Sequence, residues 1–259
     1  MPASPSAGSI RIGTSGWHYD HWRGPFYPED LPDAKMLGFY AGAFDCVEIN
    51  YTHYRLPTDK AFDHWRDSVP PGFLFAVKAS RAISHFYKLK PPFERYRRFF
   101  DGIARLGDRL GPVLFQLPPF FGRNDARLAA FLEEGLPPGV RAAFEFRHAS
   151  WEVAQVQRIL ADHDAALCVT DLEGHLSPVL ATASVAYVRL HGPRFAYTGS
   201  YGDKALEGWA SQARAWRAEG REVFIFFDND DRAMAVKDAL RLKALLAGGA
   251  WRGGGAGPI

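Results

Sequence analysis

The feature that most constrains the fold is a series of eight short apolar segments, spaced so that a helix fits between most of them. The segments cover Ile10–Thr14, Cys46–Asn50, Phe73–Lys78, Val113–Leu117, Ala142–Phe146, Ala166–Asp171, Val185–His191 and Val223–Asp228. They are continuous more often than alternating, which is typical of parallel strands covered on both faces. Eight such strands with helices between them predict an α/β fold, a (β/α)8 TIM-type barrel.

Residues that commonly cap helices precede several of the intervening segments. Thr58 is placed to cap a helix that carries Phe62 and must end before Pro70, and Asn124 is placed to cap a helix over Ala126–Glu134. The other predicted helices cover Phe93–Leu106, Trp151–Ala161, Leu206–Ala218 and Asp231–Leu246.

The organisation of the 259 residues predicts a single domain, because no linker or change of composition divides the chain. The barrel domain is expected over residues 10–247. Residues 1–9 and the Gly-rich residues 248–259 are expected to be disordered.

Composition excludes some classes of protein. The net charge is only +2, from 31 basic and 29 acidic residues, which disfavours a non-specific nucleic-acid binder and leaves a local basic patch at Arg95, Arg97 and Arg98. Cys46 and Cys168 lie inside apolar segments, as buried thiols in a reducing cytoplasm do. No apolar segment has the roughly 20 residues needed to cross a bilayer, so a cytoplasmic protein without a membrane partner is predicted.

Almost every apolar segment ends at a charged or amide residue. These residues are Glu48, Asn50, Lys78, Gln116, Glu145, Arg147, Asp171, Arg189, His191, Asp228 and Asn229. The carboxyl ends of parallel strands lie on one face of a barrel, where such residues converge on a site. Because side chains alternate across a strand, Glu145 and Arg147 lie on the same side of their strand. Arg189 and His191 likewise lie on the same side of theirs.

The mixture of charges favours acid/base chemistry on an anionic small molecule. The predicted catalytic residues are Glu48, Glu145, Asp171 and His191. The predicted substrate-binding residues are Lys78, Arg147, Arg189, Asn50, Gln116, His85, Trp17, Tyr19 and Asn229, with the first three as an anion clamp. A structural network of ion pairs is the alternative interpretation of the same charges.

No cofactor is predicted, and a divalent metal is the second choice because a metal site normally holds fewer fixed cations. The chain lacks a dinucleotide-binding turn, a Walker loop, a nucleophile elbow and a zincin helix. The loops Trp17–Pro32 and Gly192–Gly202 follow strand ends and are expected near the site.

Several motifs resemble the YecE-like family, a domain of unknown function numbered seventy-two. They are Gly13-Thr14-Ser15-Gly16-Trp17, Phe26-Tyr27-Pro28, Val47-Glu48-Ile49-Asn50, Tyr54-Arg55-Leu56-Pro57, Gly111-Pro112 to Pro118-Pro119, Glu145-Phe146-Arg147-His148 and Tyr187-Val188-Arg189-Leu190-His191-Gly192. The resemblance extends from about Ile10 to Leu246 and implies a (β/α)8-type barrel like those of endonuclease IV and xylose isomerase. It implies no activity.

Three positions depart from the pattern of the family. His53 stands where Phe is usual, Ser84 replaces the usual Thr before His85, and Asp228 replaces the first Asn of a usual pair. The last change adds a negative charge at the end of the eighth strand.

Three hypotheses for function follow. The first is an enzyme acting on a phosphate- or carboxylate-bearing small molecule, such as a sugar or nucleotide derivative. The second is a metal-dependent nucleic-acid phosphodiesterase resembling endonuclease IV. The support for this hypothesis is the similarity of the fold alone. The third is a non-catalytic metabolite-binding module. No oligomeric state follows from the sequence.

Overall fold

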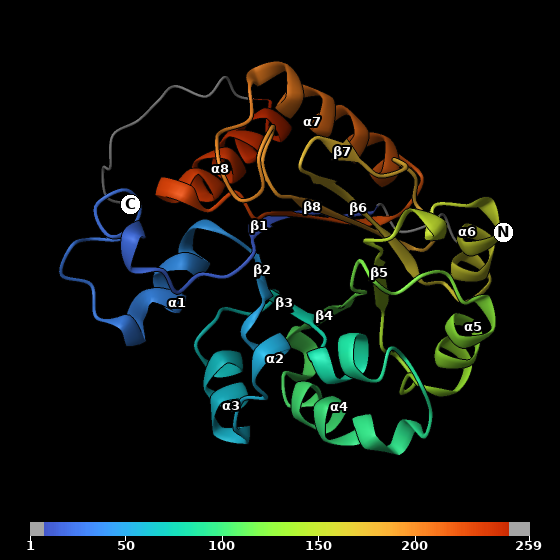
Figure 1. The fold of residues 1–259 in the computed structure, drawn as a ribbon. Helices are drawn as coiled ribbons and strands as arrows, with labels where there is room; N and C mark the ends of the chain where they lie inside the picture. The colour runs from blue at the N-terminus through green and yellow to red at the C-terminus, as the bar shows by residue number, and fades with distance from the viewer. Residues whose placement is uncertain (1–7, 249–259) are drawn as a thin grey trace, which may run out of the picture. The chain divides into compact units, whose positions relative to one another are not determined.

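The computed structural model of the protein describes residues 8–248. Its fold is the α/β fold of a (β/α)8 TIM-type barrel, as the strand pattern predicts. The strands follow the order β1-β9-β8-β6-β5-β4-β3-β2 in one sheet, and β7 pairs with β6 off this path (Figure 1). Within the described range, no helix is long and apolar enough to cross a membrane.

Each of the eight predicted segments contains a strand, and the ends differ by at most a few residues. The strands are β1 (Ile10–Thr14), β2 (Cys46–Ile49), β3 (Leu74–Lys78), β4 (Leu110–Gln116), β5 (Ala142–Glu145), β6 (Ala166–Leu172), β7 (His175–Leu176), β8 (Val185–Leu190) and β9 (Glu222–Phe227). The sequence pattern misses β7, whose two residues form a short antiparallel pair with the end of β6.

The main helices are α1 (Asp33–Ala43), α2 (Tyr51–Tyr54), α3 (Asp59–Asp67), α4 (Arg97–Ala104), α5 (Asp125–Glu134), α6 (Ala154–Asp162), α7 (Asp203–Ala218) and α8 (Met234–Leu246). The shorter helical segments are η1 (Asp20–Trp22), η2 (Ala82–Phe86), η3 (Phe93–Tyr96), η4 (Gly107–Arg109), η5 (Ala149–Trp151) and η6 (Asp231–Ala233). The two predicted caps are confirmed, because Thr58 accepts a hydrogen bond from the Ala61 amide and Asn124 accepts one from Arg127.

Three predicted helices begin later than expected, α4 at Arg97, α6 at Ala154 and α8 at Met234, each after a short 3-10 segment. The segment Trp151–Ala161 was expected to be helical from its first residue, but α6 begins at Ala154. Val153 has an extended backbone, and the Trp151 ring stacks on Phe146 with centroids 4.7 Å apart. Burial of the indole therefore determines the backbone before α6, in place of the local helical preference.

The chain divides into two compact units, the first formed by residues 1–47, 170–176 and 188–259 and the second by residues 48–169 and 177–187. The predicted domain limits stay a prediction, and most of the predicted terminal segments lies outside the described residues. Ser9, however, accepts a hydrogen bond from the Val223 amide at 2.8 Å.

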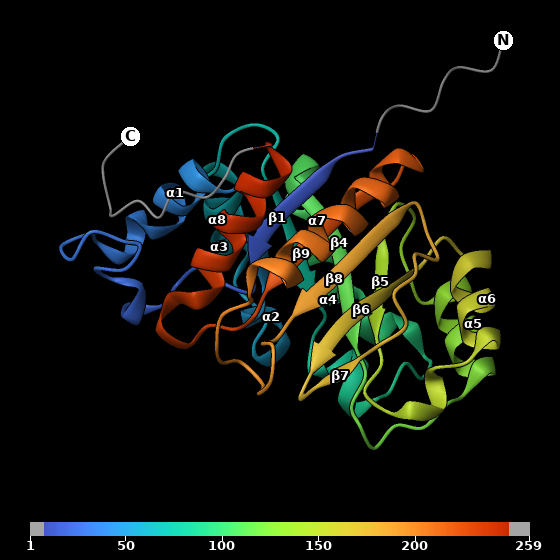
Figure 2. The same cartoon turned by 90° about the horizontal axis from the view of Figure 1, so that it is seen from above.

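In the first unit, β1 and β9 pair in parallel from Ile10 opposite Val223 to Thr14 opposite Phe227. Helix α8 packs on both strands and α7 lies beside α8 (Figures 1 and 2). The Tyr40 hydroxyl accepts from the Thr14 amide at 2.9 Å and donates to the Cys46 carbonyl at 3.1 Å. This buried ring therefore ties α1 to β1 and β2.

In the second unit, β3, β4 and β5 pair in parallel. Aromatic side chains fill its core, where the Phe115 ring lies 5.1 Å from Phe131 and 5.2 Å from Phe144 between centroids. The Trp151 indole nitrogen donates to the Phe121 carbonyl at 2.7 Å, so this buried polar group is satisfied. The packed core fixes the strand ends that carry the predicted site residues.

Candidate functional site

The second unit contains two fully buried carboxylates at strand ends, Glu48 on β2 and Glu145 on β5. The Tyr187 hydroxyl donates to Glu48 Oε2 at 2.6 Å. Glu145 forms an ion pair with Arg147, whose side chain is 10% exposed. A buried carboxylate needs such partners, since desolvation of an isolated charge costs several kcal/mol. Cys168 Sγ lies 3.9 Å from Glu145 Oε2.

The strand register aligns the amide and carboxylate side chains in this unit. Gln116 on β4 lies opposite Glu145 on β5, and Lys78 on β3 lies opposite Leu114. Asn50 follows β2 directly, and its buried Oδ1 has no hydrogen-bond partner among residues 8–248. Asn50, Lys78, Gln116 and Glu145 thus occupy the carboxyl ends of four strands of the same unit, as predicted from the sequence.

Two histidines form a pair beside β3. The His53 and His85 rings are 4.9 Å apart between centroids, and His53 Nδ1 lies 2.9 Å from the Ala79 carbonyl oxygen. Burial, with the positive charge of Lys78 next in size, lowers the pKa of His53 to about 4. Burial and the charges of Lys78 and Arg81 also lower the pKa of His85. Both rings are therefore neutral at physiological pH in a locally positive field.

In the first unit, Arg189 and Asp228 form a buried ion pair at 2.8 Å. Arg189 Nη1 also lies 2.8 Å from His191 Nε2. A guanidinium can only donate, so Nε2 accepts and Nδ1 carries the proton, which it donates to the Asp171 carbonyl at 2.9 Å. The predicted role of His191 in proton transfer stays a prediction, and it requires Arg189 to release Nε2.

Asp171 is held by three groups of the first unit. Its carboxylate accepts from the His191 amide at 2.6 Å and from the Tyr201 hydroxyl at 2.5 Å, and that hydroxyl accepts from the Gly192 amide. Burial raises the pKa of Asp171, and these hydrogen bonds oppose the rise.

The predicted binding residue Asn229 lies inside a second buried group. Its Nδ2 donates to Asp238 Oδ2 at 2.9 Å, and Asp238 also accepts from the Tyr201 amide and from Arg241. The fully buried Asp238 is thus satisfied by groups from the Gly192–Gly202 loop and α8. Asn229 therefore connects the Gly192–Gly202 loop to α8.

Trp17 and Tyr19 belong to the loop after β1. The Tyr19 hydroxyl donates to the Ser15 carbonyl at 2.7 Å, and the Trp17 carbonyl accepts from the Tyr27 hydroxyl at 2.5 Å. Farther along this loop, the fully buried Trp22 donates from its indole to Asp230 at 2.6 Å. These bonds fix the loop against its own unit.

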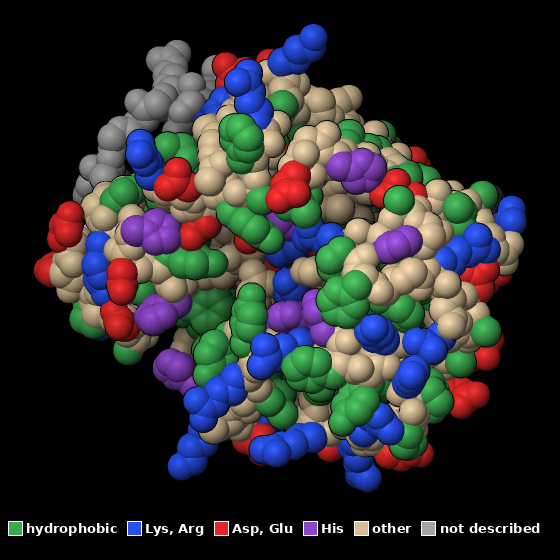
Figure 3. Space-filling view, in the orientation of Figure 1, with side chains coloured by type: hydrophobic (Ala, Val, Ile, Leu, Met, Phe, Trp, Pro, Cys, Tyr) green, Lys and Arg blue, Asp and Glu red, His purple; other side chains and the backbone are tan. Residues whose placement is uncertain are grey.

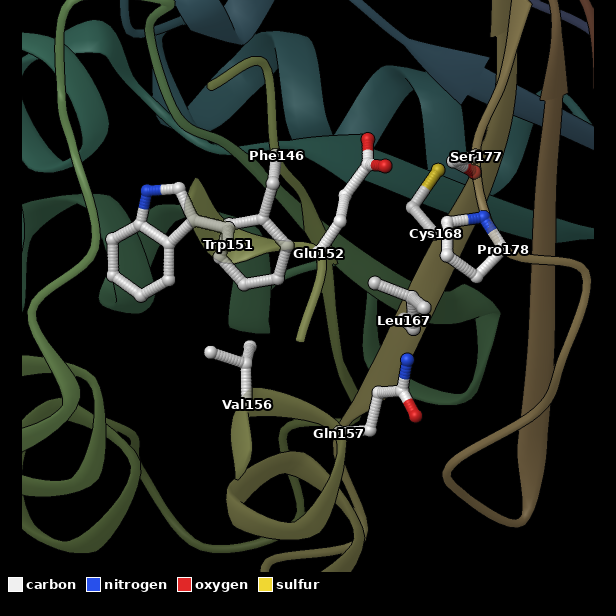
Figure 4. A pocket seen from close by; sticks show the side chains of 9 residues that line it. All are labelled: Phe146, Trp151, Glu152, Val156, Gln157, Leu167, Cys168, Ser177 and Pro178. Atoms are coloured by element: carbon white, nitrogen blue, oxygen red, sulfur yellow. The ribbon is translucent and has the colours of Figure 1, made fainter. Parts of the chain in front are cut away.

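Two hollows, one in each unit, are defined by the side chains that line them. A small apolar one in the second unit lies among Phe146, Trp151, Leu167 and Cys168, with a volume of about 10 Å³ (Figure 4). This space suits a single water molecule and is too small for a metabolite.

An open depression of about 650 Å³ in the first unit is lined by His21, Pro25, Tyr197, Asp230, Asp231, Arg232, Met234 and Lys237. Neither hollow is lined by a predicted catalytic residue. In residues 8–248, no three His, Cys, Asp or Glu side chains are grouped so that they could hold a metal ion.

The family model for proteins of unknown function DUF72 matches residues 11–253. The chain belongs to this family. This result confirms the resemblance inferred from the motifs.

Relatives in this family include UPF0759 protein YunF of Bacillus subtilis, 24% identical over 92% of this chain and 94% of that protein. UPF0759 protein YecE of Escherichia coli is 31% identical over 54% of this chain and 48% of that protein. A DUF72 family structure from Thermotoga maritima is 28% identical, with a TM-score of 0.83 over 92% of this chain and 99% of that one. An Enterococcus faecalis DUF72 structure, 19% identical with a TM-score of 0.79, shares the fold and covers 92% of this chain and 95% of its own.

Sequence reasoning did not assign the two tyrosines that donate hydrogen bonds to the carboxylates, Tyr187 to Glu48 and Tyr201 to Asp171, although Tyr201 was noted as a ring that could stack on a base or a sugar. Tyr187 precedes Arg189 by two residues on β8 and so shares its side of the strand, a signal that was present in the sequence. Tyr201 lies in an irregular loop, where no periodicity could assign it to Asp171.

Proposed function

We propose that this protein is a cytoplasmic enzyme that acts on a phosphate- or carboxylate-bearing small molecule by acid/base chemistry. The observation that carries the proposal lies in the second unit. Two buried carboxylates, a lysine and a pair of histidines occupy the ends of strands and the segments that follow them. Barrels of this type use their strand carboxyl ends for catalysis.

The base in this proposal is Glu48 or Glu145. Glu48 is oriented by a short hydrogen bond from Tyr187 to its Oε2. Glu145 is paired with Arg147, so an arriving anion could take over the guanidinium and free the carboxylate for proton abstraction. Removal of a general base typically lowers the rate by roughly 10²- to 10⁴-fold.

The anion would bind to the cations of the second unit. Burial lowers the pKa values of His53 and His85, and the charges of Lys78 and Arg81 lower them further. The same two charges attract a phosphate or carboxylate. His85 Nδ1 lies 2.9 Å from Ser84 Oγ, which fixes the orientation of its ring. The predicted roles of Asp171 and Arg189, which belong to the first unit, stay predictions.

The proposal is tested by thermal shift with phosphate, sulfate and a panel of sugar phosphates, nucleotides and carboxylic acids. We expect members of the panel to raise the melting temperature, and the shift to disappear in Lys78→Ala and Arg147→Ala. Lys60→Ala, an exposed position on α3, is the matched control and should keep the shift. If no anion gives a shift, or both variants keep it, the proposal fails.

Turnover separates catalysis from binding alone. Once a ligand is identified, Glu48→Gln or Glu145→Gln should keep ligand binding and lose conversion of the ligand. A non-catalytic binding module would instead show binding without turnover in the unchanged protein. Salt-sensitive cleavage of abasic-site DNA that depends on added zinc or manganese would replace this proposal by the phosphodiesterase alternative.

A further inference from the structure

The second unit carries several exposed aromatic rings. Eight aromatic side chains are exposed among residues 8–248, and five of them belong to this unit. These five are Tyr51, Tyr54, Phe86, Tyr87 and Phe120. Phe86 and Phe120 are 66% and 68% exposed, although a buried Phe would contribute to folding. Single exposed apolar residues need no explanation, but a group of them marks an interaction site.

Cations lie over three of these rings. The Arg81 guanidinium is 5.2 Å from the centroid of Phe86, that of Arg95 is 4.2 Å from Tyr87, and Lys88 Nζ is 4.8 Å from Phe120. We call these five rings and three cations the aromatic–cation surface. Figure 3 shows hydrophobic and Lys/Arg side chains beside one another over α2 and the neighbouring part of the unit.

The charge of this region differs from that of the whole chain. Residues 78–98 contain seven Lys or Arg and one Glu, whereas the net charge of the protein is only +2. Arg81, Lys90, Arg95, Arg97 and Arg98 are exposed. The excess is therefore presented to the solvent, where it attracts polyanions.

The segment that displays the rings is firmly anchored. Ile83 and Leu89 are buried on either side of Phe86 and Tyr87, and the Tyr96 hydroxyl donates to the Lys90 carbonyl at 2.7 Å. Anchoring removes the freedom of the backbone to turn the rings inward. On the neighbouring side, the Tyr54 ring contacts His53, and the His53 ring contacts His85, the residue before Phe86.

We propose that the aromatic–cation surface binds single-stranded nucleic acid. Unpaired bases stack on exposed rings, and the phosphates between them pair with Lys and Arg. A duplex hides its bases from such stacking, and an acidic peptide would use the cations without the rings. This binding requires neither Glu48 nor Glu145, and Arg81 is the one cation that it shares with the proposed acid/base site.

The test is fluorescence anisotropy of a labelled oligo(dT) 15-mer with the full chain in 50 mM salt. We expect saturable binding that weakens with salt, with a slope of log K against log salt of roughly −2 to −3 if three or four phosphates are neutralised. The paired duplex should bind at least roughly 10-fold more weakly, because its bases are not free to stack.

Variants separate stacking from charge. Phe86→Ala and Phe120→Ala should each weaken oligo(dT) binding by roughly 5- to 100-fold without changing the salt slope. Arg95→Ala should weaken it and make the slope shallower. The matched controls are Phe195→Ala, where the ring is 72% exposed in the first unit, and Lys204→Ala on α7; both should bind as the unchanged protein does.

Three outcomes would overturn the proposal. One is no binding of oligo(dT) up to 100 μM protein at 50 mM salt, an upper limit of about the weakest non-specific affinities of such proteins. Another is equal or tighter binding of the duplex. The third is unchanged binding in Phe86→Ala and Phe120→Ala with equal affinity for polyphosphate, which would assign the surface to polyanions in general.

Discussion

The first and second units both carry charged side chains at strand ends, but they balance these charges in different ways. In the first unit, Arg189 is paired with Asp228 and hydrogen-bonded to His191. In the second unit, burial lowers the pKa values of His53 and His85, and the charges of Lys78 and Arg81 lower them further. The same sequence pattern thus produces a neutralised network in one unit and a pair of histidines beside two cations in the other.

A polar residue at a strand end is therefore not by itself a sign of catalysis. The neutralised network holds its members in place and stabilises its unit, whereas the cations beside the histidine pair act on the pKa values of their neighbours. Substitutions should therefore affect mainly stability in the first unit and mainly electrostatics in the second. Four predictions test this contrast.

The largest effect is expected for Arg189→Met in the first unit. Removing the guanidinium takes one donor from the Asp228 carboxylate and one from His191 Nε2, and breaking a buried pair costs about 3–5 kcal/mol of the free energy of unfolding. Urea denaturation measures the loss. The double variant Arg189→Met/Asp228→Asn should recover part of it, and a loss below about 1 kcal/mol in the single variant would contradict the neutralised network.

His53→Phe in the second unit should change the dependence of stability on pH. The pKa of His53 is about 4 in the folded protein and 6.5 ordinarily, so between these values the unfolded chain takes up a proton that the folded protein refuses. Stability is therefore lost as pH falls from 6.5 to 4, by at most about 3 kcal/mol for this residue. Between pH 6.5 and pH 4, the free energy of unfolding of the variant should fall by that much less than that of the unchanged protein. Urea denaturation measures both. Parallel curves for the two proteins would show that His53 does not titrate as described.

Tyr201→Phe should lower stability by about 1–3 kcal/mol, because Asp171 loses a donor and the Gly192 amide loses an acceptor. The pKa of Asp171 should rise further, since the Tyr201 hydrogen bond lowers it. Urea denaturation and NMR titration of the carboxyl carbon measure the two effects. Tyr54→Phe, at a ring 68% exposed, is the control and should change stability by less than about 0.5 kcal/mol.

The smallest effect on stability is expected for Arg81→Ala, within about 0.5 kcal/mol, because its side chain is exposed. The variant should nevertheless raise the pKa of His85, since the charge of Arg81 lowers it. NMR titration of the imidazole protons measures this change. Arg98→Ala provides a control of equal charge, and an identical response in both variants would show that the field at His85 is not local.

The fold was largely predictable because the sequence signals for its strands and helices lie within or directly beside those elements. Continuous apolar segments correspond to strands, and the Thr58 and Asn124 caps mark helix starts correctly. Prediction failed where a tertiary contact determines the backbone, as in the delayed start of α6 beside the buried Trp151. The two-residue β7 was too short to produce a pattern.

The sequence predicted which residues lie at the strand ends of the candidate site. It did not predict which of those residues form ion pairs or hydrogen bonds with one another. Alternation correctly predicted that Arg189 and His191 would share a direction, and they are in contact. It could not predict that Asp228, a candidate acid, would neutralise Arg189, because that pairing joins β8 to the end of β9. In the sequence, His53 was notable only because it departs from the pattern of the family. Its lowered pKa depends on burial and on the charge of Lys78, and both arise only in the folded protein.

The turn η2 has a further consequence for the exposed rings that follow it. Its five residues form a π-helix, closed by a hydrogen bond from the Tyr87 amide to the Ala82 carbonyl at 2.9 Å, so it contains one residue more than an α-helical turn. Deleting Ala82 would restore α-helical spacing and rotate the later side chains by about 100°. Such a deletion is expected to abolish oligo(dT) binding in the anisotropy assay while every ring and cation stays in the chain. The number of residues in one turn thus decides which aromatic faces meet the solvent.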